Sequence, residues 1–233
     1  MTSPVSDLVD YVQTALRERA DPEKAAGMQA YMKTDMPFYG VQKPERVKII
    51  RAVKSRFSPD SHRDYLDSVT ALWELSHREE KYLAQAFARA FPEHILPGSL
   101  AMYRRFIVEG AWWDFVDETA THMIRELVLG YPGEMWPVVE GWADDADLWL
   151  RRTVLISQVG AKDGTDPDRL FRFCAARTHE KEFFIRKAIG WALRDYAYTD
   201  PEAVARFVTD HRDDLSTLSF REATKHIGHL VSV

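Results

Sequence analysis

The chain has little material for redox or metal chemistry. Its 233 residues include a single cysteine, which excludes an internal disulfide. Cys174 lies in the apolar segment LFRFCAA without a neighbouring histidine, so we interpret it as a small buried side chain rather than a nucleophile. No HExxH, CxxC, P-loop or GxGxxG motif occurs, and His226 and His229 lack further ligands. We therefore expect neither a metal nor a cofactor.

Long hydrophobic runs are also absent. No stretch of about 18 apolar residues occurs, so the sequence predicts no transmembrane helix. The sequence MTSPVSDLVDYVQ at the N-terminus lacks the basic start and apolar stretch of a signal peptide. These features predict a cytoplasmic protein with no membrane partner, and nothing in the sequence argues for an oligomer, so we expect a monomer.

Positive charge is in the minority, with 31 Lys and Arg against 36 Asp and Glu. On average this balance argues against a nucleic-acid partner, because phosphate contacts need cations. The cations are nevertheless clustered: residues 43–56 hold six basic residues and one acidic, and residues 181–194 hold four and one. The segment FREATKH adds Arg221 and Lys225. Each cluster alone is typical of a solvated helix face, whereas three clusters lining one groove would suit a polyanion.

Strand signals are almost absent, and helix signals fill the chain. There is no sustained alternation of apolar and polar residues. Asp-Pro occurs at residues 21–22, 166–167 and 200–201, where Asp caps a helix and Pro occupies its first turn. Lys43-Pro44 offers a fourth start.

The helical periodicity predicts thirteen short helices with short links. They cover residues 6–19, 22–33, 44–56, 61–75, 79–91, 98–109, 113–129, 133–143, 147–159, 167–177, 181–196, 201–211 and 219–229. Consecutive short helices pack as antiparallel pairs, and stacked pairs give an α-α superhelix of the HEAT or armadillo kind. We therefore predict an all-α fold in one domain, residues 1–233.

Residues 34–43, TDMPFYGVQK, form the longest non-helical patch of the N-terminal half. The sequence favours a packed connector here. The alternative is a loop whose Tyr39 and Gln42 touch a ligand.

Four residues do not fit a plain core. Trp113 and Asp117 stand four residues apart in AWWDFVDETATHMI and share one helix face. Arg152 rises from an apolar stripe in DADLWLRRTVLISQ, and a buried Arg needs an anionic partner. A structural ion pair, with Asp117 itself for example, and a functional anion contact are equally compatible with this pattern. Trp191 has Lys187 four residues before it and Arg194 three after it, so it borders a basic face rather than the Phe183 and Phe184 side.

These blocks resemble the AlkD-type DNA alkylation repair glycosylases, a family of HEAT-like proteins. The resemblance runs nearly end to end through AYMKTDMPFYGV, AWWDFVDETATH, WLRRTVLISQ, EFFIRKAIGWALRDYA and LSFREATKH. It implies that Asp117 is the catalytic aspartate, Trp113 and Trp191 its paired aromatics, and Arg152 the active-site arginine. It further implies excision of cationic N3- and N7-alkylated purines, such as 3-methyladenine and 7-methylguanine, from duplex DNA without base flipping.

The same resemblance and the basic clusters together predict the DNA-binding residues. They are Tyr31, Tyr39, Gln42, Lys43, Arg46, Arg151, Lys187, Arg194, Arg221 and Lys225. Two alternatives stay open: a DNA-structure binder of the same fold without catalysis, and a protein-interaction scaffold, which is the usual role of HEAT-like arrays.

Overall fold

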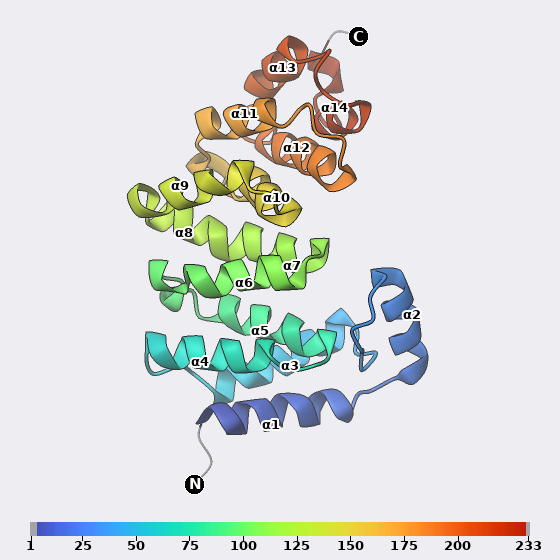
Figure 1. Ribbon diagram of the computed structural model, residues 1–233, viewed down its shortest axis with the longest axis vertical. Coiled ribbons are helices and arrows are strands. Elements are labelled where there is room, and N and C mark those ends of the chain that lie inside the picture. The colour runs from blue at the N-terminus through green and yellow to red at the C-terminus, as the bar shows by residue number, and fades with distance from the viewer. Residues whose placement is uncertain (1–3, 232–233) are drawn as a thin grey trace. The chain divides into compact units, whose positions relative to one another are not determined.

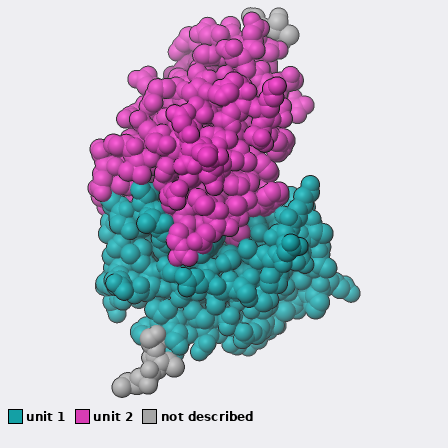
Figure 2. All heavy atoms as spheres, viewed as in Figure 1, with its two compact units in different colours: residues 1–102 teal, residues 103–233 magenta. Residues whose placement is uncertain are grey.

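Helices and turns make up the described chain. The computed structural model describes residues 4–231, and within that range it contains no strand (Figure 1). The predicted all-α class is therefore confirmed. The chain separates into two compact units, Met1–Met102 and Tyr103–Val233, which Figure 2 colours teal and magenta. The prediction of one domain over the full chain stays a prediction.

The described part of the first unit, residues 4–102, contains five complete α-helices. They are α1 (Pro4–Arg17), α2 (Pro22–Met32), α3 (Lys43–Arg56), α4 (His62–Trp73) and α5 (Arg78–Ala90), with short 3-10 turns at Pro92–His94 and Pro97–Ser99. Helix α4 packs against α5, and α1 packs against both α3 and α4. Leu8 and Val12 of α1 and Tyr65 and Val69 of α4 are fully buried at these contacts, so the first unit has an apolar core of its own.

The second unit holds the remaining helices. They are α6 (Leu100–Gly110), α7 (Trp113–Glu118), α8 (Arg125–Gly130), α9 (Pro132–Gly141), α10 (Leu148–Ile156), α11 (Pro167–Ala176), α12 (Phe183–Tyr196), α13 (Pro201–Asp210) and α14 (Thr217–Ala223). Three residues of α6 precede the boundary between the units. Helix α10 packs against α7 and α12, and α12 packs closely against α14 (Figure 1).

The Asp-Pro dipeptides start helices as predicted. Asp21, Asp166 and Asp200 are the N-cap residues of α2, α11 and α13. Each carboxylate accepts a hydrogen bond from the backbone N–H three residues later, which satisfies one of the free donors of the first turn.

The helix predicted over residues 113–129 is interrupted. Residues Thr119–Ile124 form a π-helical turn between α7 and α8. The hydroxyls of Thr119 and Thr121 donate to the carbonyls of Phe115 and Asp117, where they compete with backbone N–H groups for the same acceptors. Such turns are frequent at functional sites, and this one begins two residues after Asp117.

The connector between α2 and α3 is packed, as the sequence favoured. The Glu79 carboxylate is fully buried and accepts hydrogen bonds from the backbone N–H groups of Tyr39, Gly40 and Val41. The Tyr39 hydroxyl donates to Glu80 at 2.9 Å. Burial beside this carboxylate raises the pKa of Tyr39 to about 12. The phenol is thus a structural group of the first unit.

No helix of the described residues is long and apolar enough to cross a membrane. Cys174 of α11 is completely buried, and burial raises the pKa of its thiol, which agrees with the predicted structural role.

Candidate functional site

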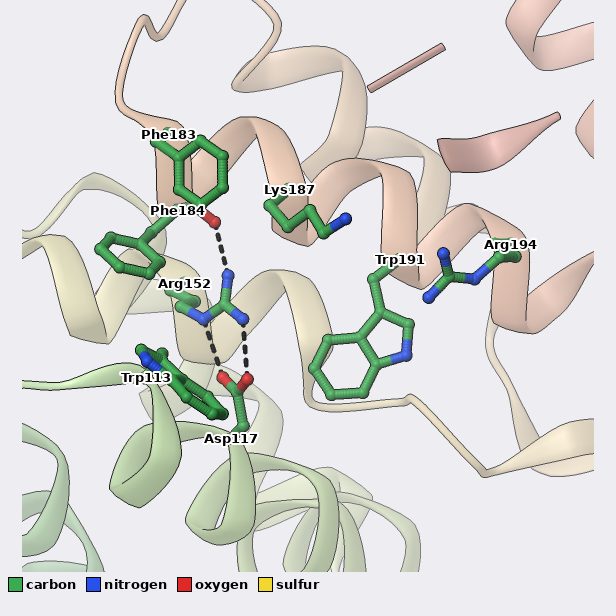
Figure 3. A pocket seen from close by; sticks show the side chains of 8 residues that line it. All are labelled: Trp113, Asp117, Arg152, Phe183, Phe184, Lys187, Trp191 and Arg194. Carbon is green, nitrogen blue, oxygen red and sulfur yellow. Dashed lines mark hydrogen bonds and ion pairs between the residues drawn. The ribbon is translucent and has the colours of Figure 1, made fainter. Parts of the chain in front are cut away.

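The four unusual residues of the sequence meet in the second unit. Trp113 and Asp117 come from α7, Arg152 from α10 and Trp191 from α12, and all four line one cleft of about 300 Å³. In the view of Figure 3 the Asp117 carboxylate lies between the two indoles, with the Arg152 guanidinium above it. Residues separated by up to 78 positions in the chain are therefore brought to one place by the packing of three helices.

A two-pronged ion pair joins Asp117 to Arg152. The Arg152 Nε and Nη2 donate to Oδ1 and Oδ2 of Asp117, both at 2.8 Å, and Nη1 donates to the Phe184 carbonyl at 2.5 Å. Only 3% of the Arg152 side chain and 18% of the Asp117 side chain are exposed. An ion pair with Asp117 was one of the two interpretations that the sequence allowed for Arg152. In the structure this pair orients the carboxylate. For the functional anion contact that the sequence also left open, the Arg152 side chain has almost no exposed surface.

A cluster of aromatic rings lies beside the Arg152 guanidinium. Trp149 lies 4.9 Å from Phe184, and Trp112 lies 5.6 Å from Phe184, centroid to centroid. The Arg152 Cζ lies 5.8 Å from the centre of the Phe184 ring. Low-polarity walls of this kind strengthen electrostatic interactions with the carboxylate.

Burial and the Arg152 guanidinium act in opposite directions on the pKa of the Asp117 carboxyl. Its burial raises its pKa above the ordinary aspartate value, and the neighbouring Asp114 acts in the same direction. The Arg152 guanidinium opposes this shift. A cationic group placed in the cleft would therefore meet a poorly hydrated carboxylate that gains from an additional positive neighbour.

Two further cations line the cleft beside Trp191. Lys187 Nζ lies 2.6 Å from Glu222 Oε1, and Arg194 Nη1 donates to Glu222 Oε2. The Glu222 carboxylate is 13% exposed, and hydrogen bonds from Lys187, with the charges of both cations, hold its pKa below the usual glutamate range. Glu222 was not among the predicted site residues.

The cleft also includes two aromatic residues that the sequence assigned to the other side of their helix. Phe183 and Phe184 line the cleft, and 53% of Phe183 is exposed. The signal was present: positions 184, 187, 191 and 194 recur every three or four residues and form one face of α12.

The other predicted DNA-binding residues of the second unit lie outside the cleft lining. Arg151 donates to the Glu180 carboxylate at 3.1 Å and to the Asp145 carbonyl at 2.7 Å, so its guanidinium ties two connecting segments together. Arg221 on α14 and Lys225 just after it are exposed. Their contact with DNA stays a prediction.

Five predicted residues belong to the first unit: Tyr31, Tyr39, Gln42, Lys43 and Arg46. Tyr31 on α2 is 72% exposed, and Gln42 and Lys43 are exposed at the start of α3. The Arg46 guanidinium donates to the Val41 carbonyl at 2.7 Å, which closes the connector onto α3. The single groove predicted for the three basic clusters includes residues 43–56 of this unit, and it stays a prediction.

Within residues 4–231, no group of three or more His, Cys, Asp or Glu side chains is arranged to hold a metal ion.

The fold and the cleft define a class: helical proteins that hold a carboxylate–guanidinium pair between indoles. A family model described as "DNA alkylation repair enzyme" matches residues 12–227, and the chain belongs to this family. A solved structure described as a predicted DNA alkylation repair enzyme from Enterococcus faecalis is similar, with a TM-score of 0.79 and 28% sequence identity. The match covers 89% of this chain and 96% of that chain. No curated protein matches.

Membership confirms the family resemblance seen in the sequence. The likeness to the Enterococcus structure also supports the predicted helical-repeat fold. The family indicates a role in the repair of alkylated DNA and makes DNA the partner.

Proposed function

We propose that the protein is a DNA glycosylase that excises cationic N3- and N7-alkylated purines from duplex DNA, acting as a monomer and without flipping the base. The observation that carries the proposal is the Asp117 carboxylate, held by Arg152 inside a cleft that Trp113 and Trp191 line.

An alkylated purine of this class already carries a formal positive charge and is a good leaving group. Cleavage breaks the bond between the sugar carbon and the base nitrogen, and the bonding electrons leave with the base, which becomes neutral. Positive charge then develops on the sugar, and water adds to the same carbon and releases a proton. The chemistry therefore needs stabilisation of a cation at the sugar more than it needs an acid at the base.

Asp117 and the two indoles supply that stabilisation. A preorganised charged group at the site of developing charge contributes roughly 3–4 kcal/mol to lowering a barrier. Indole faces attract cations by up to about 2 kcal/mol where water is excluded. The Asp117 carboxylate also accepts a hydrogen bond from the attacking water and directs it to the sugar carbon.

The composition of the cleft supports recognition of a backbone rather than of a base. Its lining consists of four aromatic residues, one carboxylate and three cations: Trp113, Asp117, Arg152, Phe183, Phe184, Lys187, Trp191 and Arg194. Side-chain amides and hydroxyls, which read base edges, are not among these lining residues, and the cations there also suit phosphates. Selectivity would then come from the weak bond of the lesion itself.

The test is release of free base from duplex DNA containing 7-methylguanine, measured by chromatography. Asp117→Asn should lower the release rate by about a hundredfold to a thousandfold. Asp114→Asn is the matched control, because it removes a carboxylate from the same helix but outside the cleft lining. At neutral pH we expect this control to release base at the rate of the unmodified protein.

Folding needs its own control, because Asp117→Asn leaves the buried Arg152 without its anion. Helical content and melting temperature are measured for each variant, and Trp191→Leu, which keeps the ion pair, provides a second cleft variant with an expected partial loss. Full activity of a folded Asp117→Asn protein would overturn the mechanism. DNA binding without base release by the unmodified protein would instead favour the non-catalytic binder, and the absence of salt-sensitive DNA binding would favour the scaffold.

A further inference from the structure

Glu222 occupies a distinctive position between the two outer cations of the cleft. Lys187 and Arg194 are seven residues apart on α12, which is about 10.5 Å of helix rise. Their side chains nevertheless converge on the two oxygens of one carboxylate. Both cations line the cleft, whereas Glu222, on α14, is not among the lining residues.

A glycine makes this arrangement possible. Gly190 stands between the two cations on α12, and a Cβ atom added there would lie 2.5 Å from Glu222 Cβ and 2.9 Å from the Ser219 carbonyl oxygen. The absence of a side chain at residue 190 therefore allows α14 to approach α12 closely. The Ser219 hydroxyl, which donates to the Arg186 carbonyl at 2.9 Å, fixes the same approach.

The charge balance of the cleft depends on this one carboxylate. The lining residues carry three cations and one anion, a formal charge of +2, and Glu222 lowers the total to +1. The pair formed by Asp117 and Arg152 is already neutral. Lys187 and Arg194 are thus the groups left to meet a phosphate, and each already has an anionic partner.

We propose that Glu222 is a positioning residue that holds Lys187 and Arg194 in place as an internal stand-in for a DNA phosphate and competes with that phosphate for them. The inference rests on the proposed function, since it assigns these cations to the DNA backbone. While DNA is absent, Glu222 keeps two long side chains ordered beside Trp191. When a phosphate arrives, it must share or replace the carboxylate, so Glu222 limits affinity for DNA and favours release of the product.

The test is the binding of an unmodified DNA duplex to the full chain over a range of salt concentrations. Glu222→Gln should bind about tenfold more tightly at low salt, because each cation freed for a phosphate releases counterions. The slope of log affinity against log salt should steepen by about one unit. Loss of a merely structural group would not steepen that slope.

Glu140→Gln is the matched control. The Glu140 carboxylate likewise accepts hydrogen bonds from two cations, Arg169 at 2.9 Å and Arg172 at 2.7 Å, and it does not line the cleft. The substitution changes the net charge of the protein by the same amount. We expect its affinity and salt slope to equal those of the unmodified protein.

A second Glu222 variant and a combined variant complete the experiment. Glu222→Ala keeps the Cβ that contacts Gly190 and should reproduce the tighter binding. Adding Lys187→Gln and Arg194→Gln to Glu222→Gln should remove the gain.

Unchanged or weaker binding by folded Glu222 variants would overturn the inference, and so would loss of helical structure in both of them. Base release by the unmodified protein is scored separately. Tighter binding by Glu222→Gln without any base release would reject the glycosylase and keep the role of Glu222.

Discussion

Among the described residues, Arg152 alone is seen to donate to the Asp117 carboxylate, and this makes the site sensitive to individual residues. This carboxylate receives both hydrogen bonds from Arg152, and its pKa is raised by burial and by Asp114. The sequence placed Asp117 and Trp113 on one face by spacing alone. It left the role of Arg152 open because a partner 35 positions away cannot be read from local periodicity.

The first prediction concerns the pH dependence of base release. A carboxylate with a raised pKa loses its charge as the pH falls through a value above the ordinary aspartate range near 4. The rate should therefore decline on acidification from a higher pH than an exposed aspartate would give. Asp114→Asn removes one cause of the shift and should move this decline to lower pH, while the rate at neutral pH stays the same.

Release rates are measured from neutral to acidic pH for both proteins. Because acid itself releases alkylated purines, substrate without protein is followed at every pH and subtracted. A decline at the same pH in both proteins would contradict the electrostatic role assigned to Asp114.

The second prediction concerns Cys174. The side chain is fully buried and burial raises the pKa of its thiol, so little thiolate is present and reagents cannot reach it. We expect no reaction of the folded protein with a disulfide reagent such as DTNB, and reaction of one thiol after denaturation. Rapid labelling of the folded protein would show that α11 opens readily.

At the scale of helices, local signals and long-range contacts differ in how well the sequence reveals them. The capping Asp residues at 21, 166 and 200 were predicted because a cap and its helix are adjacent in the chain. The π-helical turn Thr119–Ile124 was missed because its residues keep ordinary helical periodicity. Glu222 was missed because its partners lie 28 and 35 positions away.

The third prediction tests the close packing of α12 and α14. Gly190→Ala places a Cβ against the backbone and Cβ atoms of α14, which cannot move aside as a flexible chain end would. We expect a loss of about 1–3 kcal/mol in the free energy of unfolding, measured by denaturant titration.

Gly133→Ala on α9 is the matched control for that substitution. An added Cβ at this helical position meets nothing within 4 Å. The change should therefore be neutral or stabilise the protein by up to about 1 kcal/mol, since alanine favours helices over glycine. Equal effects of the two substitutions would show that the contact of α12 with α14 is looser than described.

At the scale of the whole molecule, the chain holds two compact units, each with its own buried core. Composition and helix count did not reveal this division, because the helices predicted from the sequence have similar lengths and short links in both halves of the chain. The formal net charge of −5 was likewise a poor guide, since the cleft lining carries +2. Averages over the chain conceal the local charge that decides which ligand fits.

The fourth prediction follows from the two units. Glu79 is buried in the first unit and accepts three backbone hydrogen bonds. Glu79→Gln should therefore lower the free energy of unfolding of that unit by about 2–3 kcal/mol. Of the seven tryptophans, Trp73 alone belongs to the first unit. We therefore expect the denaturant midpoint to fall more when unfolding is followed by circular dichroism, which reports helices of both units, than when it is followed by tryptophan fluorescence. Equal shifts would indicate a single cooperative transition.

The guanidinium of Arg152 joins α7, through Asp117, to the first turn of α12, through the Phe184 carbonyl. Replacement of a buried ion pair by well-packed apolar residues often increases stability. Selection for thermal stability alone would thus favour loss of this pair, and with it the carboxylate that the proposed chemistry needs. Stability and catalysis therefore place opposite demands on this one contact. Efforts to engineer a more stable form of this protein should leave residues 117 and 152 unchanged and introduce stabilising substitutions at other positions.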